Sequence, residues 1–397
     1  MALGERAVEG VAMSDARGSD DALGAFGGRR VLVTGHTGFK GSWLCLALSR
    51  LGARTSGFAL PPPTEPSHFE LAGIAELLHA HVLGDVRDPA ALGAAIDAAD
   101  PEIVLHLAAQ PLVRASYEAP VETFATNVMG TVHLLEAVRL RARPCVVVVV
   151  TSDKAYENVG QPWGYRECDA LGGHDPYSAS KGAAELVVAS YRRSFFAPER
   201  VAEHGVKLAT ARAGNVIGGG DFARDRIVVD AARALAEGRS VPVRNPGAIR
   251  PWQHVLEPVH GYLHLAARML ASDEPRWCSA WNLGPLPGDE LPVAALVERL
   301  CAAWGDGRWH DAREPGAVHE ASVLRLAIDK VIAELGVRPR WRVDEAVART
   351  ARWYRRWADA ASGASGASGK KRGAAAGPTS MRAASLEDLR AYAAAAP

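Results

Sequence analysis

Cysteine is scarce in this chain, and its placement limits the kinds of protein that the sequence can encode. The 397 residues contain five cysteines, an odd number that a disulfide framework of a small secreted protein would not use in full. They are far apart and never at the short spacings that bind zinc. They are Cys45, Cys145, Cys168, Cys278 and Cys301. We therefore expect reduced thiols, no metal site and a cytoplasmic protein.

The chain also lacks an excess of either positive or negative charge, and it lacks long apolar runs. Lysine and arginine together number 45, and so do aspartate and glutamate, so no net field favours nucleic acid or an anionic membrane surface. No apolar run reaches the about 20 residues that a membrane-spanning helix needs. The first 28 residues carry acidic side chains and no sustained apolar core, which excludes a secretory signal. We expect neither a nucleic-acid nor a membrane partner.

Both ends of the chain lack sustained hydrophobic periodicity. Residues 1–28 are rich in Gly, Ala and Asp, and we expect them to form a flexible extension. Residues 358–397 consist largely of Ala, Gly and Ser, so we expect a flexible tail there. Within it, residues 385–395 could form one short helix, capped by Ser385 with Asp388 three residues on.

Residues 29–238 alternate short apolar strands with segments of helical hydrophobic spacing. Strands and helices that alternate at these lengths form βαβ units. The predicted fold class is α/β: a Rossmann-type, doubly wound parallel sheet. The expected strands are 31–34, 55–60, 81–83, 103–107, 146–150 and 207–212. The expected helices are 42–51, 71–78, 89–99, 121–141, 227–237 and one that contains Tyr177.

Residues 239–357 break this alternation into shorter elements. We expect strands 241–244 and 279–283 and helices 259–271, 293–304 and 344–357. This pattern predicts a smaller C-terminal substrate-binding lobe over the carboxyl edge of the sheet, with some segments returning to the sheet.

A glycine-rich turn links the first expected strand to the first helix. Gly35, Gly38 and Gly41 are spaced three and three, whereas the common dinucleotide fingerprint has spacings of two and three. Glycines at this point permit a tight turn and let a pyrophosphate approach the amide donors of a helix N-terminus. We predict that the turn binds a dinucleotide cofactor. The candidate residues are Gly35, Thr37, Gly38, Phe39, Lys40 and Gly41.

The second expected strand ends without the acidic residue that would hold the adenosine ribose hydroxyls. Ala59 and Leu60 stand there, no acid occurs before Glu65, and no Lys or Arg is present to bind a 2′-phosphate. NAD is therefore favoured over NADP. After the third strand, Asp85 and Val86 could contact the adenine, with a turn or cap role as the alternative for Asp85.

The fourth expected strand ends in side chains that would let a cofactor lie close. The candidates for cofactor contact are Leu107, Ala108, Ala109 and Gln110. His106, just before them, is better explained as a structural residue at the end of the strand.

Five consecutive valines, residues 146–150, predict a buried parallel strand. Ser152, Asp153 and Lys154 follow at its carboxyl end, where open α/β sheets bind their ligands. In isolation, Asp153 and Lys154 would be explained by a surface ion pair.

Tyr177 and Lys181 are four residues apart and share one face of the expected helix. A free phenol has a pKa of about 10 and is a poor base at neutral pH. A nearby ammonium and a positive nicotinamide ring can lower that pKa, because both favour the phenolate. Together with Ser152 and the glycine turn, this pair predicts an enzyme that transfers a hydride.

Several longer stretches of the chain match sequence motifs. They are Gly35-His-Thr-Gly-Phe-Lys-Gly-Ser-Trp, Pro62-Pro-Thr-Glu-Pro-Ser, Thr151-Ser-Asp-Lys-Ala-Tyr-Glu-Asn, Asp175-Pro-Tyr-Ser-Ala-Ser-Lys-Gly, Ala211-Arg-Ala-Gly-Asn-Val-Ile-Gly-Gly-Gly-Asp and Arg250-Pro-Trp-Gln-His-Val. Asn127, with Gly130 and Thr131, adds to them. With these motifs, residues 28–357 resemble the extended short-chain dehydrogenase/reductases that act on nucleotide sugars. The resemblance is closer still to the CDP-glucose 4,6-dehydratases.

The resemblance implies NAD-dependent dehydration of CDP-glucose to CDP-4-keto-6-deoxyglucose by internal hydride transfer, a step in deoxysugar and surface-polysaccharide biosynthesis. Tyr177 would be the base for the fourth hydroxyl of the sugar, and Ser152 would hydrogen-bond the reacting oxygen. Lys181 would hold the nicotinamide ribose and lower the pKa of the tyrosine. Asp153 and Lys154 are candidates for the acid and base of water loss, with Lys154 alternatively acting as a cation.

The resemblance also implies further contacts and an assembly. Asn127 would join the cofactor-binding residues, and Asn215, Arg226 and Arg250 would grip the nucleotide diphosphate. Arginine suits this role because its planar fork can bind two phosphate oxygens. A homodimer or homotetramer is expected from the family.

Two other functions remain as alternatives. A nucleotide-sugar 4-epimerase, or a dehydratase for another nucleotide sugar, would use the same Ser152, Tyr177 and Lys181. Asp153 and Lys154 argue against the epimerase, which needs no acid–base pair for elimination. A non-catalytic NAD-binding regulator is disfavoured, because it could have lost Tyr177 or Lys181 and this chain has both.

Overall fold

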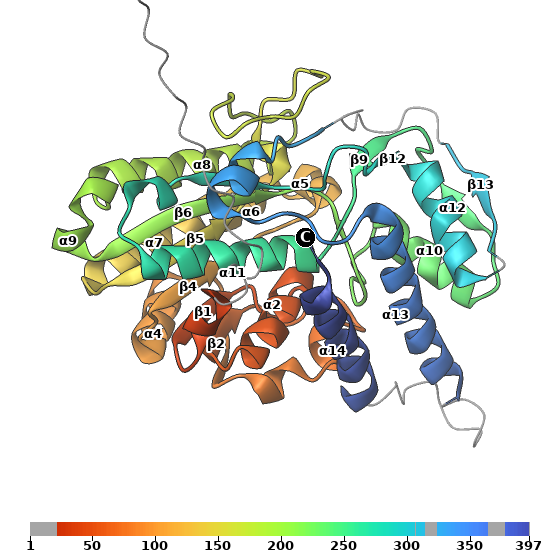
Figure 1. Cartoon of the computed structure of the whole chain (residues 1–397), viewed down its shortest axis with the longest axis horizontal. Coiled ribbons are helices and arrows are strands. Elements are labelled where there is room, and N and C mark those ends of the chain that lie inside the picture. The colour runs from red at the N-terminus through yellow and green to blue at the C-terminus, as the bar shows by residue number, and fades with distance from the viewer. Residues whose placement is uncertain (1–21, 306, 314–323, 364–377, 397) are drawn as a thin grey trace, which may run out of the picture.

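A seven-stranded parallel sheet forms the centre of the protein (Figure 1). The computed structural model describes residues 22–305, 307–313, 324–363 and 378–396. The strand order β3-β2-β1-β4-β5-β6-β11 reverses its direction between β1 and β4, which confirms the predicted doubly wound fold. The strands are β1 (Arg30–Thr34), β2 (Arg54–Ala59), β3 (Ala80–Leu83), β4 (Ile103–His106), β5 (Cys145–Val150), β6 (Val206–Ala213) and β11 (Ala280–Leu283).

The run of valines in β5 is explained by burial on both sides. Alternate side chains of this strand enter two separate hydrophobic clusters, one on each face of the sheet. One cluster includes residues of α2 (Phe39–Arg50) and α11 (Leu256–Ala271). The other includes residues of α4 (Pro89–Ala99), α7 (Gly130–Arg141) and α8 (Pro176–Ser194). A strand covered by helices on both faces needs apolar residues at every position.

The predicted long helix at 121–141 is present, and it contains one irregular turn that the sequence does not indicate. A π-helical turn, Ala125–Met129, joins α6 (Pro120–Phe124) to α7, and α5 (Val113–Glu118) precedes them. Such turns are frequent at functional sites, because the extra residue redirects a side chain. Here the turn contains Asn127, which is only 2% exposed.

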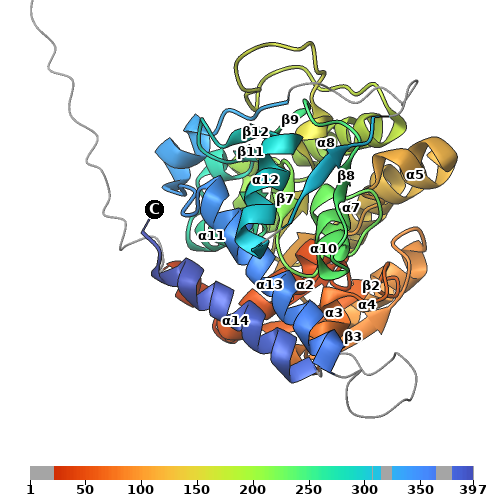
Figure 2. The ribbon, with the colours of Figure 1, turned by 90° about the vertical axis from the view of Figure 1, so that its right-hand side faces the viewer.

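A smaller lobe lies over the carboxyl edge of the sheet (Figure 2). It carries α10 and α12 and three two-stranded ladders, β7 with β10, β8 with β13 and β9 with β12. β11 leaves the lobe and pairs with β6, as expected for a segment returning to the sheet. The elements of the lobe are β7 (Val216–Ile217), α10 (Ile227–Ala236), β8 (Val241–Val243), β9 (Ile249–Pro251), β10 (Gln253–His254), β12 (Glu290–Pro292), α12 (Val293–Trp304), β13 (Trp309–Asp311) and α13 (Val343–Gly363). Two short helices between strands of the central sheet are α3 (His68–Leu71) and α9 (Val201–His204).

Part of the predicted N-terminal extension is folded, which corrects that expectation. Residues Ala22–Phe26 form a 3₁₀ helix, and Phe26 is fully buried against the cluster of α2 and α11. The single aromatic ring supplies the burial that the Gly- and Ala-rich surroundings cannot. Residues 1–21 lie outside the described residues.

The predicted C-terminal tail also contains a packed helix. α14 (Pro378–Ala394) lies beside α13 and α3 (Figure 2). Ser385 is in the middle of this helix and donates a hydrogen bond to the carbonyl of Met381, so the predicted cap at Ser385 is wrong. The high alanine content makes this segment resemble a flexible tail, although one face of the helix, which includes Met381 and Tyr392, is buried. Residues 364–377 and 397 lie outside the described residues.

A buried carboxylate connects α14 to α11. Glu257 is 6% exposed and accepts hydrogen bonds from Tyr392 Oη at 2.7 Å and from the backbone N–H of Trp341 at 2.8 Å. Burial raises the pKa of Glu257 from 4.5 to about 7, although these hydrogen bonds oppose the increase. The folded protein therefore keeps a proton that the unfolded chain releases at lower pH.

We expect Glu257 to make the protein less stable as the pH rises from about 4.5 to about 7. In this window the native state binds more protons at this site than the unfolded state does, so the free energy of unfolding falls with pH. Glu257→Gln should reduce the stability difference between about pH 5 and about pH 7.5 by about 2–3 kcal/mol in urea unfolding. The control Glu199→Gln, at an exposed position, should leave the difference unchanged. An unaltered pH dependence in Glu257→Gln would contradict the assignment.

Candidate active site

A deep cleft lies between the carboxyl edge of the sheet and the smaller lobe. It encloses about 2280 Å³, more than twice the roughly 1,000 Å³ at the upper end for small-molecule sites. It therefore has room for a dinucleotide and a second ligand. The predicted cofactor residues that line it are Gly35, Thr37, Gly38, Phe39, Lys40, Gly41, Asp85, Val86, Leu107, Ala108 and Ala109. The predicted catalytic and substrate residues that line it are Ser152, Asp153, Lys154, Tyr177, Lys181, Asn215, Arg226 and Arg250.

The glycine turn between β1 and α2 has the geometry of an anion cradle. Gly35 has a φ of +76°, and a Cβ there would lie 2.6 Å from the backbone nitrogen of Ala108. A Cβ at Gly41 would overlap the carbonyl of Gly35. Gly38 caps α2 with extended backbone and no side-chain hydrogen bond, so the amides of the first turn remain available to a ligand. These residues fit the pyrophosphate of a dinucleotide such as NAD.

The adenosine side of the cradle has no carboxylate at the end of β2, as the sequence indicates. Thr37 Oγ1 instead donates a hydrogen bond to the carbonyl of Leu60 at 2.8 Å, which ties the turn to this strand end. Asp85 lines the cleft, but its carboxylate accepts hydrogen bonds from the backbone and guanidinium of Arg87. The Arg87 guanidinium lowers the pKa of Asp85. Asp85 thus acts as a turn residue, and an adenine contact stays a prediction.

Gln110 and Asn127 differ from the other predicted cofactor residues, because neither lines the cleft. Asn127 Oδ1 accepts a hydrogen bond from the backbone N–H of Gln110 at 2.8 Å, and Asn127 Nδ2 donates to Ser180 Oγ at 2.8 Å. The hydroxyl of Ser180 donates in turn to the carbonyl of Tyr177. The asparagine of the π-helical turn therefore joins the end of β4 to α8, and the structure gives it a positioning role.

Tyr177 and Lys181 lie on the buried face of the first turns of α8. Burial raises the pKa of Tyr177 to about 12, although a hydrogen bond with Ser152 opposes the increase. Burial also lowers the pKa of Lys181 to about 8, and the charge of Lys40 acts in the same direction. In the protein alone the phenol is protonated at neutral pH, so added positive charge in the cleft is needed to make it a base.

Ser152, Asp153 and Lys154 form the first turn after β5, and Asp153 is 2% exposed. Ser152 Oγ donates to Asp153 Oδ1 at 2.8 Å and accepts from the backbone N–H of Lys154 at 3.2 Å. Among the described residues, none hydrogen-bonds Asp153 Oδ2. A Cβ at Gly214 would lie 3.0 Å from this oxygen, so the glycine leaves space beside it. Asp153 therefore lines the cleft with one buried carboxylate oxygen that has no hydrogen-bond partner in the described parts of the chain.

Lys40 of the glycine turn is coupled to the same carboxylate. Burial lowers the pKa of Lys40 to about 8, while the negative charge of Asp153 opposes that decrease. The side chain thus lies between the cofactor cradle and the predicted catalytic residues. The sequence places Lys40 only among the cofactor residues and gives no signal for this coupling.

The predicted substrate residues come from three segments around the cleft. Asn215 follows β6, Arg226 precedes α10, and Arg250 lies in β9 with 7% exposure. Arg226 is 3.8 Å from the carboxylate of Asp221, between Nε and Oδ2. Trp252 donates a hydrogen bond to the carbonyl of Leu291, which favours a packing role for it.

Two arginines that the sequence does not single out also line the cleft. Arg114 and Arg244 both contact Asp225 Oδ1, at 3.4 and 2.8 Å. Asp225 has a φ of +61°, a conformation that few residues other than glycine adopt. No sequence pattern brings α5 and the loop after β8 together, so these arginines could be found only in the structure.

A buried network of polar side chains holds the residues on either side of the Ser152–Lys154 turn. Glu185 of α8 pairs with Arg212 of β6 at 2.8 Å, with side chains 3% and 4% exposed. Glu185 also accepts hydrogen bonds from the hydroxyls of Thr151 and Thr210. Arg212 donates to Tyr156 Oη at 2.7 Å. The network therefore links α8 to both ends of the Ser152–Lys154 turn.

We expect Arg212→Met to lower the free energy of unfolding by about 3–5 kcal/mol, because it leaves the Glu185 carboxylate buried and uncompensated. The double variant with Glu185→Leu should recover part of this loss in urea unfolding. Arg200 and Glu203 form an exposed ion pair, and Arg200→Met should not change the unfolding midpoint. An equal loss of stability in the single and double variants would contradict the role assigned to the pair.

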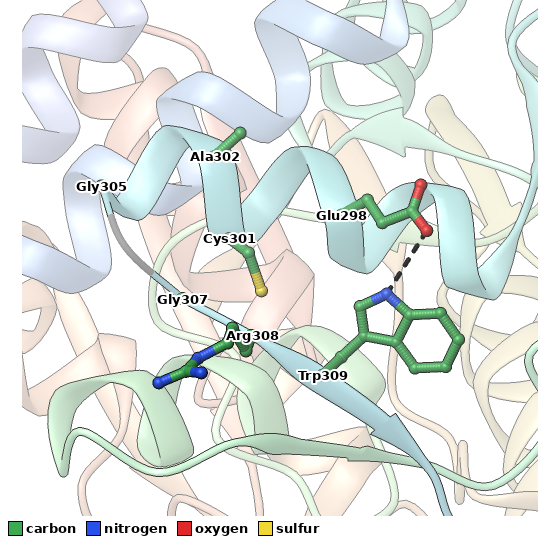
Figure 3. Close-up of a pocket in the computed structure, with 7 residues that line it drawn as sticks. All are labelled: Glu298, Cys301, Ala302, Gly305, Gly307, Arg308 and Trp309. Atoms are coloured by element: carbon green, nitrogen blue, oxygen red, sulfur yellow. Dashed lines mark hydrogen bonds between the residues drawn. The ribbon is translucent and has the colours of Figure 1, made fainter.

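A second, smaller cavity of about 420 Å³ lies between α12 and β13 (Figure 3). Its residues include Cys301, Arg308, and Trp309, whose indole donates to Glu298 at 3.4 Å. Among the described residues, no group of three or more His, Cys, Asp or Glu could hold a metal ion. No helix in the described parts of the chain is both long and apolar enough to cross a membrane.

Comparison with known proteins agrees with the fold and the cleft. The model of the NAD dependent epimerase/dehydratase family matches residues 31–284. The chain is 49% identical to a CDP-glucose 4,6-dehydratase of Salmonella typhimurium, over 83% of this chain and 91% of that protein. It is 32% identical to a dTDP-glucose 4,6-dehydratase of Streptomyces antibioticus, over 82% of this chain and 92% of that protein.

A solved structure shares the same architecture. A UDP-glucose 4-epimerase of Thermus thermophilus, in complex with NAD, superposes with a TM-score of 0.67 at 25% identity, covering 82% of this chain and 99% of that chain. The family match covers more than half of the 397 residues. The protein belongs to the NAD dependent epimerase/dehydratase family.

Proposed function

We propose that the protein is a hydro-lyase that converts CDP-glucose to CDP-4-keto-6-deoxyglucose with NAD. The observation that carries the proposal is the buried Asp153 carboxylate, which lines the cleft beside Ser152 and Lys154 and has one oxygen without a hydrogen-bond partner among the described residues. An epimerase needs no group to remove water, whereas a dehydratase needs both an acid and a base. The 49% identity to a CDP-glucose 4,6-dehydratase supports the same reaction.

The first step removes hydrogen from the fourth carbon of the sugar. When bound, NAD supplies the acceptor and later the donor of a hydride, and a complete cycle leaves it unchanged. Tyr177 Oη takes the proton of the fourth hydroxyl, and Ser152 holds the same oxygen by a hydrogen bond. Lys181 places a positive charge beside the phenol, which favours the phenolate once water is excluded.

The second step removes water between the fifth and sixth carbons. The ketone at the fourth carbon acidifies the neighbouring hydrogen, so a base can take it as a proton. Asp153 protonates the departing sixth hydroxyl, and neutral Lys154 takes the proton of the fifth carbon, after which its ammonium stabilises the enolate as a cation. Both side chains follow β5 directly, so a single turn carries both candidates for the elimination chemistry.

The nucleotide part of the substrate is assigned to the far wall of the cleft. Arg226 and Arg250 supply guanidinium groups for the diphosphate, and Asn215 supplies an amide. A dehydratase that acts on another nucleotide sugar, or a 4-epimerase, is the alternative. The 32% identity to a dTDP-glucose 4,6-dehydratase makes dTDP-glucose the first competitor to test.

We also infer a cytoplasmic enzyme that assembles as a homodimer or homotetramer. Val121 of α6 is 82% exposed and Leu186 of α8 is 58% exposed. Apolar side chains on two neighbouring helices favour contact with a second copy. The described cysteines form no disulfides, which agrees with a reducing compartment.

The substrate assignment predicts turnover of CDP-glucose in preference to dTDP-, UDP- and GDP-glucose. The purified protein, supplied with NAD, should give a product lighter by one water in mass spectrometry, with the absorbance of a 4-ketosugar in base. Higher kcat/KM for another nucleotide sugar would contradict the choice of base. Interconversion of epimers without loss of water would identify a 4-epimerase.

The mechanism predicts different effects for the two proposed proton-transfer residues. Tyr177→Phe should lower kcat about 10²–10⁴-fold, because no base remains for the fourth hydroxyl. Asp153→Asn should lower overall turnover similarly while still allowing reduction of NAD, measured at 340 nm in a single turnover. Exposed Tyr117→Phe is the matched control and should retain activity. Full activity of Tyr177→Phe would contradict the mechanism.

A further inference from the structure

The C-terminal helix α14 reaches the back of the cofactor cradle through a short chain of buried hydrogen bonds. Ser385 of α14 is fully buried, and its hydroxyl lies 3.0 Å from His68 Nε2. His68 Nδ1 lies 2.8 Å from the hydroxyl of Ser42. Ser42 is in the first turn of α2, where its N–H donates to the carbonyl of Gly38. The amides that would face a pyrophosphate belong to this turn.

His68 acts as a neutral link in this chain. Burial lowers its pKa to about 3, so the ring carries one N–H and one acceptor nitrogen at neutral pH. Both nitrogens have a serine partner, and loss of the Ser385 hydroxyl would leave Nε2 unpaired in the interior. An unpaired buried polar atom is costly, so the ring would shift to find another partner.

The same ring supports the loop on the substrate side. His68 stacks on Trp43 of α2 with ring centres 4.7 Å apart and 7° between the planes. The indole of Trp43 donates to the carbonyl of Gly219 at 2.9 Å. A Cβ at Gly220 would lie 2.5 Å from that of His68. A shift of His68 would therefore move both α2 and the loop that leads to Arg226.

A second contact fixes the helix that carries His68. The guanidinium of Arg382 on α14 donates to the carbonyls of Ala72 and Gly73, both at 2.7 Å, just after α3. It also pairs with Glu76 at 2.6 Å. α14 thus holds α3 at both ends, with Arg382 after its last turn and Ser385 against its first residue, beside α13 (Figure 2).

We propose that α14 is a positioning element of the active site, which fixes the first turn of α2 and the Gly219–Gly220 loop through Ser385 and His68. This inference rests on one part of the proposed function, the binding of NAD at the glycine turn between β1 and α2. Ser385 acts through His68, so it is a positioning residue and takes no part in proton transfer.

The test compares three full-length variants for NAD binding by calorimetry and for thermal unfolding. Ser385→Ala leaves His68 Nε2 and Trp353 Nε1 without their shared partner; the resulting shift of His68 should displace the first turn of α2 and raise the Kd for NAD about tenfold, which corresponds to about 1.4 kcal/mol. Arg382→Met should also raise the Kd for NAD. Because Arg382 is partly exposed, this variant can be tested even if Ser385→Ala does not fold. Glu387→Gln, on the same helix as Ser385 and Arg382, weakens the exposed contact with Arg356 of α13 and should leave the Kd unchanged.

Unchanged NAD affinity in both Ser385→Ala and Arg382→Met, even with lower unfolding temperatures, would overturn the proposal and leave α14 as a stabilising helix only. This result differs from a failure of the proposed function. In that case the wild-type protein would bind NAD without dehydrating CDP-glucose, and the effect of the variants on NAD binding would still decide the role of α14.

Discussion

The buried ion pair between Glu185 and Arg212 is the interaction on which the rest of the cleft depends. It joins α8, which carries Tyr177 and Lys181, to β6, and Glu185 also binds Thr151 at the end of β5. Neither charge is solvated, so each requires the other. Because strand, helix and catalytic turn share this one contact, their relative positions do not vary independently.

Burial controls the chemistry of the cleft as well as its shape. It shifts the pKa of Tyr177 upward and those of Lys40 and Lys181 downward. In each case burial stabilises the neutral form relative to the charged form. Groups held in this way respond strongly to the charge of a ligand, since little solvent screens them. A cationic ring and an anionic diphosphate entering together would shift these equilibria. Proton transfer is thereby linked to the presence of both ligands.

Sequence patterns predict the sheet and its carboxyl edge well, because each depends on local periodicity. The valine run, the glycine turn and the spacing of Tyr177 and Lys181 are visible without any long-range contact. The patterns fail where burial is decided by partners distant in the chain. Phe26 and α14 look like parts of flexible ends, yet their few apolar side chains pack into a core formed by other segments. The coupling of Lys40 to Asp153 depends on contacts of the same kind.

The fate of the hydrogen at the fourth carbon of the sugar tests internal hydride transfer most directly. CDP-glucose labelled with deuterium at that carbon would be incubated with the protein and NAD, and the product analysed by NMR. The proposed mechanism predicts deuterium on the sixth carbon of the same sugar. Deuterium retained at the fourth carbon, or lost to solvent, would contradict it.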